Sequence, residues 1–123
     1  RRKRTSEIYD RMLLPTGIQR LEHSRQDRQG NYHLYLVRVP GITTEQRNDI
    51  ITKMAEAGIA CNVHFKPLPM MTAYKNLGFD IADYPRAYAQ YANEITLPMH
   101  TLIADDDAEY VAEKFAKLLK EYI

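Results

Sequence analysis

An imidazole and an ammonium group, those of His64 and Lys66, stand two residues apart at the end of an apolar run. Pro67 and Pro69 follow, and they impose a stiff, extended corner because proline cannot donate to a strand ladder. Polar side chains held at such a corner are common ligand positions. The segment therefore favours a binding site at His64, with Phe65 and Lys66 beside it. The sequence equally allows His64 to bond a nearby backbone group while Lys66 is solvated.

The other reactive side chains do not form a pattern. Four histidines are spread along the chain: His23, His33, His64 and His100. None has a Cys or His at metal-ligand spacing, and Cys61, among apolar neighbours, is expected to be a small buried hydrophobe. The acidic run 105–107 could hold a cation, but the start of a helix explains it better. The sequence predicts no catalytic and no metal-binding residue.

Hydrophobic periodicity predicts the elements that position these residues. Helices are expected over 1–14, 43–57, 70–77, 85–93 and 105–122, and strands over 32–39, 59–65 and 94–97. The strand 32–39 is apolar or aromatic on both faces, so it should be central and covered on both sides. The segment 20–31 is polar and without a period, which predicts a loop.

Local signals support the helices. Thr43 and Gln46 have the spacing of a capping box, and Gly58 stands where a left-handed residue ends a helix. Three tyrosines near one face of the helix 85–93 are expected to be buried by packing: Tyr84, Tyr88 and Tyr91. The element order predicts one α+β domain over residues 1–123. We expect a two-layer α/β sandwich, with an about three-stranded, mainly antiparallel sheet and helices packed on one face.

Composition excludes several classes of protein. The 123 residues include 17 basic and 16 acidic side chains, an ordinary balance for a soluble domain. No apolar run approaches the roughly 20 residues of a membrane span, and the charged start is unlike a signal peptide, so we expect a cytoplasmic protein. The bases that open the chain should form the solvated face of a helix. Because no stacking aromatics alternate with them, nucleic-acid binding is not expected.

A series of short motifs runs in order along the whole chain. It comprises the basic helix 1–13, the His-x-Tyr strand 31–38, Arg47, Gly58-Ile59, the corner 63–68, the segment 74–78, Tyr84-Pro85 and the strand 95–98. This order resembles the C-terminal segment of DegT-type sugar aminotransferases, which use pyridoxal phosphate (PLP) and are similar to other fold-type I enzymes. Three positions depart from the family: Phe65 replaces a more common Tyr, Pro69 a His, and Ala104 a capping Thr.

The resemblance implies the small C-terminal domain of such an enzyme. The parent would be a homodimer that transfers an amino group from an amino acid to a nucleotide-linked keto-sugar. Its large domain would supply the lysine that holds PLP; no lysine of this chain lies in a similar motif, so the chain alone is expected to bind no PLP and to be inactive. His64, Phe65, Lys66 and His33 would border the substrate pocket. The alternative is a free-standing α+β module that binds a ligand or regulates, because fold does not fix function.

Overall fold

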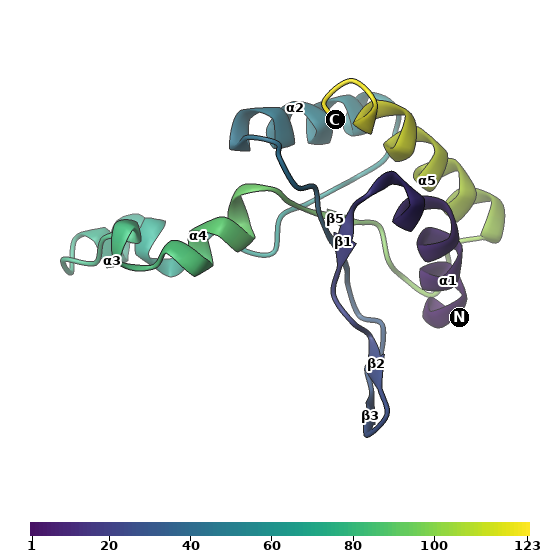
Figure 1. Cartoon of the computed structure of the whole chain (residues 1–123), viewed down its shortest axis with the longest axis horizontal. Helices are drawn as coiled ribbons and strands as arrows, with labels where there is room; N and C mark the ends of the chain where they lie inside the picture. Colours follow the sequence, from purple (N-terminus) through teal and green to yellow (C-terminus); the bar gives the residue numbers. More distant parts are fainter.

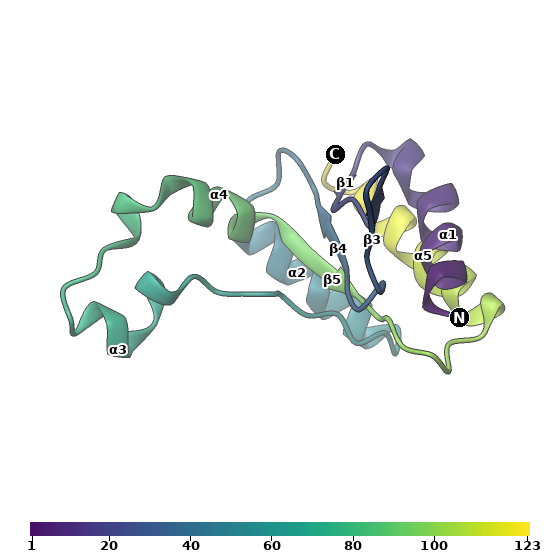
Figure 2. The same ribbon diagram turned by 90° about the horizontal axis from the view of Figure 1, so that it is seen from below.

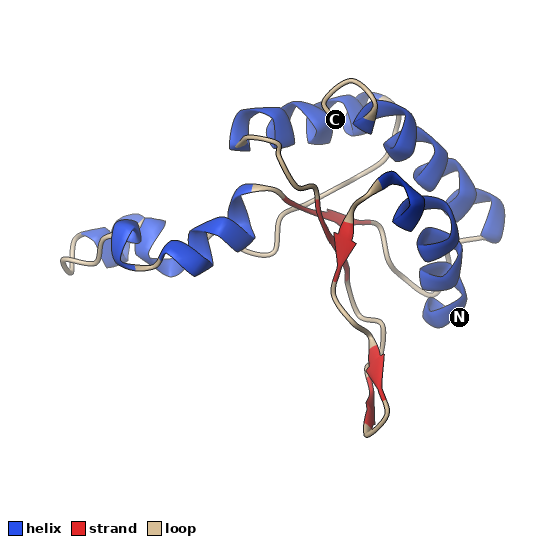
Figure 3. Cartoon of the chain, viewed as in Figure 1, coloured by secondary structure: helices blue, strands red, loops and turns tan.

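The chain forms a body of helices on a small sheet, from which an arm and a hairpin project (Figure 1). The computed structural model describes residues 1–123. The helices are α1 (Arg2–Leu13), α2 (Thr44–Glu56), α3 (Thr72–Lys75), α4 (Pro85–Ala92) and α5 (Asp105–Leu119), with 3₁₀ turns at Leu14–Thr16, Leu68–Met70 and Ile81–Asp83. The strands, red in Figure 3, are β1 (Gln19–Arg20), β2 (Ser24–Arg25), β3 (Arg28–Gln29), β4 (Tyr35–Arg38) and β5 (Glu94–Leu97).

The main sheet has three strands in the order β1-β4-β5, and both pairings are antiparallel. Tyr35 lies opposite Leu97 and Val37 opposite Ile95, so these four side chains share one face. The strands β2 and β3 form a separate hairpin. The predicted α+β fold with a three-stranded antiparallel sheet is thus confirmed.

The identity of the third strand differs from the prediction. The expected strand 59–65 forms a single bridge, Asn62 to Thr96, at the outer edge of β5. Side chains replace the ladder there, because the N–H of Val63 donates to the side chain of Asn62 and that of His64 donates to Glu94. The third strand is instead β1, inside the polar segment expected as a loop. Two residues are too few to show an alternation in sequence.

The central strand β4 is shorter and less covered than predicted. It begins at Tyr35, three residues late, since Tyr32 has a left-handed φ of 55° that interrupts an extended strand. Tyr35 and Val37 are fully buried, whereas Leu36 and Arg38 on the other face are half-buried. The position in the middle of the sheet is confirmed, but the expected cover on both faces is wrong.

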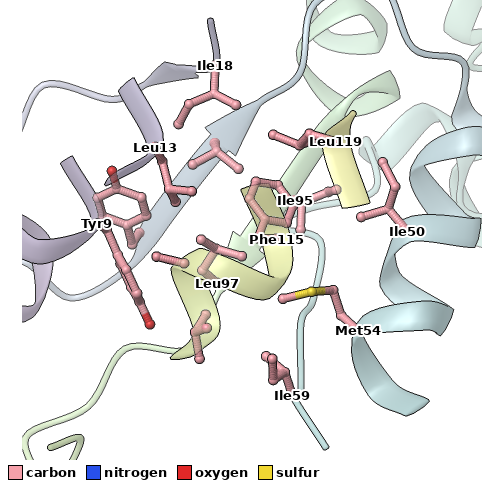
Figure 4. Packing of buried hydrophobic residues seen from close by; sticks show 14 of the residues in the cluster. Tyr9, Leu13, Ile18, Ile50, Met54, Ile59, Ile95, Leu97, Phe115 and Leu119 are labelled. Carbon is pink, nitrogen blue, oxygen red and sulfur yellow. The ribbon is translucent and has the colours of Figure 1, made fainter. Parts of the chain in front are cut away.

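The core lies between the sheet and three helices, α1, α2 and α5, on one face (Figure 2). Phe115 and Leu119 of α5 pack on Ile95 and Leu97, and Met54 of α2 closes the side (Figure 4). Each such side chain contributes about 1.5–3 kcal/mol through burial. This core of nineteen apolar residues holds the sheet firmly in place.

Both predicted signals of helix α2 are confirmed. The N–H of Gln46 donates to the Thr43 hydroxyl at 3.2 Å, and the N–H of Thr43 donates to the Gln46 side chain at 2.8 Å. Gly58 follows the helix with a φ of 77°. These end contacts fix where α2 begins and ends, and therefore where its buried side chains reach the sheet.

The basic residues Lys3, Arg4 and Arg11 of α1 are exposed, as predicted, whereas Arg2 is half-buried. Two of the exposed ones also pair with α5. Arg4 bonds Asp105 at 2.6 Å and Arg11 bonds Glu109 at 2.8 Å. The residue that precedes α5 is Ala104, which has no capping side chain, and its N–H donates to Asp107 at 3.4 Å. The acidic run therefore serves the junction of two helices. Exposed pairs of this kind contribute about 0–1 kcal/mol each.

The arm, residues 65–92, extends away from the body and includes α3 and α4 (Figures 1 and 2). None of its residues is buried. Tyr84 and Tyr88 are 40% and 42% exposed, so the expectation that they are buried is wrong. A helix as short as α3, with four residues, is not stable from its own hydrogen bonds. No helix of the chain combines the length and apolarity required to cross a membrane.

Candidate functional site

His64 lies at the base of the arm, against the outer edge of β5. The N–H of Asn62 donates to the Thr96 carbonyl at 3.1 Å, and the N–H of Thr96 returns a bond of 2.7 Å. The N–H of His64 donates to Oε2 of Glu94 at 2.8 Å. Three hydrogen bonds therefore fix the backbone on which the imidazole is mounted.

The imidazole joins a short polar chain of side chains. Nδ1 of His64 lies 2.9 Å from the Thr96 hydroxyl, which donates to Oε1 of Glu94 at 2.6 Å. Glu94 and Thr96 are two residues apart in β5, so they share the face opposite Ile95 and Leu97. Nε2 of His64, on the far side of the ring, has no partner in the chain and is not buried. Nε2 is therefore the one nitrogen of this ring that is free to bond a ligand.

Glu94 is a buried carboxylate with a donor on each oxygen. Its side chain is 1% exposed. Burial raises the pKa of Glu94, and this rise is opposed by the bonds from the Thr96 hydroxyl and the His64 N–H and by the charge of Arg47. Since hydrogen bonds satisfy both oxygens, the cost of burying the group is reduced.

Arg47 of α2 holds the C-terminal end of the arm through hydrogen bonds. Its side chain is 2% exposed and donates to the carbonyls of Tyr91 and Glu94, at 3.1 and 3.3 Å. Nε donates to Asn48 at 2.8 Å, and the guanidinium lies 4.7 Å from the centre of the Tyr91 ring. The structure thus gives this motif residue a role, which is to hold the junction of α4 and β5.

Phe65 and Lys66 extend outward from His64. The Phe65 ring is 73% exposed and meets the His64 ring edge-on at 4.6 Å. The peptide bond between His64 and Phe65 is cis. Lys66 is exposed, and no hydrogen bond or ion pair joins it to the rest of the chain. These three candidates are consecutive residues at the base of the arm, and the rings of the first two are in contact.

His33 does not join them. It is exposed, in the segment that precedes β4, and its N–H donates to the side chain of Asn31. Strand β4 pairs with one edge of β5, whereas His64 lies along the other edge. The structure places the two predicted imidazoles on opposite sides of a strand, so they do not share one pocket within this chain.

The sequence did not reveal Glu94 and Thr96 as parts of the site. A Glu and a Thr with one apolar residue between them are common in a half-buried strand. The alternation with Ile95 and Leu97 does show that both point away from the core. Which residue they face depends on the bridge to Asn62, which no local pattern predicts.

Lys53 does not have the surroundings expected of a lysine that holds PLP. Such a lysine needs a lowered pKa to act as a nucleophile. Hydrogen bonds with Tyr122, Glu121 and Asp49 instead raise the pKa of Lys53. Lys66 and Lys75 are exposed and stand next to no carboxylate. His, Cys, Asp and Glu side chains do not gather in threes anywhere in the structure, as a metal site would require.

Comparison with solved structures identifies the class of this fold. The chain matches Spr1654 of Streptococcus pneumoniae, described as a sugar aminotransferase, with 46% identity and a TM-score of 0.95 in both its PLP and PMP forms. The match to the PMP form covers 98% of this chain and 31% of the other. PseC of Helicobacter pylori, an aminotransferase of pseudoaminic acid biosynthesis, has the same fold at 23% identity and a TM-score of 0.87, over 98% of this chain and 32% of PseC.

The chain belongs to the DegT/DnrJ/EryC1/StrS aminotransferase family, whose model matches residues 1–116. A curated relative is the spore coat polysaccharide biosynthesis protein SpsC of Bacillus subtilis, which is 33% identical over 95 residues. That match covers 72% of this chain and 24% of SpsC. The chain therefore spans about a quarter to a third of the length of the relatives it matches.

Proposed function

We propose that this chain is the C-terminal domain of a PLP-dependent sugar aminotransferase, a cytoplasmic homodimer. The enzyme would transfer an amino group from an amino acid to a nucleotide-linked keto-sugar. The observation that carries the proposal is the 46% identity to Spr1654, at a TM-score of 0.95, along almost the whole chain. Because the match spans 31% of that protein, the residues that hold PLP would lie in the remaining part of the enzyme.

Within the enzyme, PLP would supply the electron sink for the reaction. The part of this domain would be to bind and orient the sugar. His64 supports this role, because its ring is fixed by β5 and its Nε2 is open to a ligand. Phe65 adds an exposed aromatic face beside it, which suits a sugar or a nucleobase.

The apolar arm supports the view that the domain works inside a larger protein. Phe65 and Leu77 are 73% and 74% exposed, and α3 and α4 bury no residue in this chain. Patches of this kind are characteristic of protein interfaces. The remaining part of the enzyme would cover them and bring His64 to the active site.

The test is His64→Ala in the intact enzyme, with His100→Ala as a control that removes an exposed imidazole outside the candidate site. Losing one hydrogen bond of about 0.5–1.5 kcal/mol should raise KM for the keto-sugar about 2- to 12-fold. The PLP absorbance and the control should be unchanged. An unchanged KM in His64→Ala would remove His64 from the pocket, and an intact full-length enzyme that binds no PLP would refute the proposed function as a whole.

A further inference from the structure

The bonds from Glu94 to His64 constrain where protons can lie. Thr96 has one hydroxyl proton and two polar neighbours, Oε1 of Glu94 at 2.6 Å and Nδ1 of His64 at 2.9 Å. A carboxylate can only accept, so the proton points to Glu94. The hydroxyl oxygen is then free to accept a bond from His64, and Nδ1 must carry the proton.

We propose that Glu94 and Thr96 are positioning residues that hold neutral His64 with its proton on Nδ1. A neutral imidazole has one N–H, so Nε2 carries a lone pair and faces outward as a hydrogen-bond acceptor. The inference rests on the proposed function, and it deepens it by naming what His64 recognises. The matching ligand group is a donor, namely a hydroxyl of the sugar substrate.

Burial explains why this arrangement is specific. Glu94 and Thr96 are 1% and 4% exposed, so water does not compete for the Thr96 proton. The second oxygen of Glu94 accepts from the His64 N–H, which fixes the carboxylate relative to the same residue whose ring it controls. The ring and its backbone are therefore set by one side chain.

The variant Glu94→Gln should reverse the tautomer with almost no change of shape. The amide oxygen must take the place that accepts from the His64 N–H, because that donor would otherwise be unpaired. The amide nitrogen then faces Thr96 and donates to its hydroxyl. The Thr96 proton turns to Nδ1 of His64, and the proton of the imidazole moves to Nε2.

The experiment is nitrogen NMR of histidine side chains in the 123-residue chain, at alkaline pH where imidazoles are neutral. His64 is identified as the signal lost in His64→Ala. The protonated ring nitrogen resonates far from the unprotonated one, so the tautomer is read directly. We expect Nδ1–H in the wild type, Nε2–H in Glu94→Gln, loss of the preference in Thr96→Val, and its retention in Thr96→Ser.

The wild-type spectrum alone shows which nitrogen of His64 carries the proton, so the proposal can be tested even if a variant does not fold. A wild-type Nε2–H tautomer, or a folded Glu94→Gln chain that keeps Nδ1–H, overturns the proposal. In the intact enzyme, Glu94→Gln should raise KM for the keto-sugar about 2- to 12-fold, as His64→Ala does. Thr96→Ser, which keeps the hydroxyl, should have a KM closer to the wild-type value than Thr96→Val has. If the tautomers are as expected but His64→Ala leaves KM unchanged, the sugar-binding role fails and the positioning role of Glu94 and Thr96 stands.

Discussion

Replacing Arg47 with alanine should lower the free energy of unfolding by about 3–5 kcal/mol. The side chain is 2% exposed, and it donates to the main-chain carbonyls of Tyr91 and Glu94. Truncation leaves the buried Glu94 carbonyl without that donor, at about 1–3 kcal/mol, whereas the Tyr91 carbonyl keeps the bond from the Asn93 N–H. The lost packing of the stem against the Tyr91 ring adds to this cost, while release of a buried charge offsets part of it. The loss is a large share of the about 5–15 kcal/mol that stabilises a domain.

Two further variants separate the causes. Arg47→Met keeps most of the stem and removes the donors, so the difference between the Met and Ala variants measures packing alone. Arg11→Ala is the surface control, since it removes an exposed ion pair with Glu109 and should cost less than about 1 kcal/mol. Urea unfolding of the chain, followed by circular dichroism, gives all three values on one scale.

An Arg47→Ala chain that is as stable as the Arg11→Ala chain, with an unchanged slope of the free energy of unfolding against urea concentration, would refute this prediction. That result would mean that the Glu94 carbonyl finds another partner without cost. A strong loss in Arg47→Ala but none in Arg47→Met would assign the effect to packing and not to the buried hydrogen bonds.

Two more predictions concern Gly58 and Cys61. Gly58→Ala should cost about 1 kcal/mol in the same unfolding assay, because φ is 77° and an added Cβ meets no atom within 4 Å; a cost above about 2 kcal/mol would require a steric clash that the structure lacks. Cys61 is half-buried against the core, and this burial raises the pKa of its thiol to about 12. At pH 8 a thiol reagent should therefore label it about a thousandfold more slowly in the folded chain than in urea, and equal rates would contradict the raised pKa. The folded pKa lies above the unfolded one, so stability should decline as pH rises from about 9 toward 12.

The sequence predicts the helical parts of the fold well, because their signals are local. The capping box at Thr43 and the left-handed Gly58 each depend on residues within one turn of a helix end, and both are found as expected. The sheet is predicted less well. Whether 59–65 or 19–20 supplies the third strand depends on pairing with distant segments, and proline and side-chain acceptors decide it at the outer edge of β5.

The candidate site shows the same division. Its most reactive residue, His64, follows from its own neighbourhood, a polar side chain before a proline corner. Its partner Glu94 is 30 residues away and reaches it through the register of Asn62 on Thr96, which periodicity does not encode. His33 has the same side chain, but it precedes the central strand β4, which pairs with the other side of β5, so residue type alone does not place it in the site.

The arm and the site differ in what holds them. No residue of the arm is buried, yet both of its ends are tied to β5: the entry through Asn62 and His64, and the exit through Arg47. The acceptor face of His64 therefore belongs to the folded body and does not depend on what covers the arm. Phe65 and Lys66, one and two residues further on, have no such ties, so their positions should depend on the surface the arm meets. A ligand that contacts His64, Phe65 and Lys66 would therefore find His64 already in place in the folded domain, whereas Phe65 and Lys66 would be positioned only when the enzyme assembles.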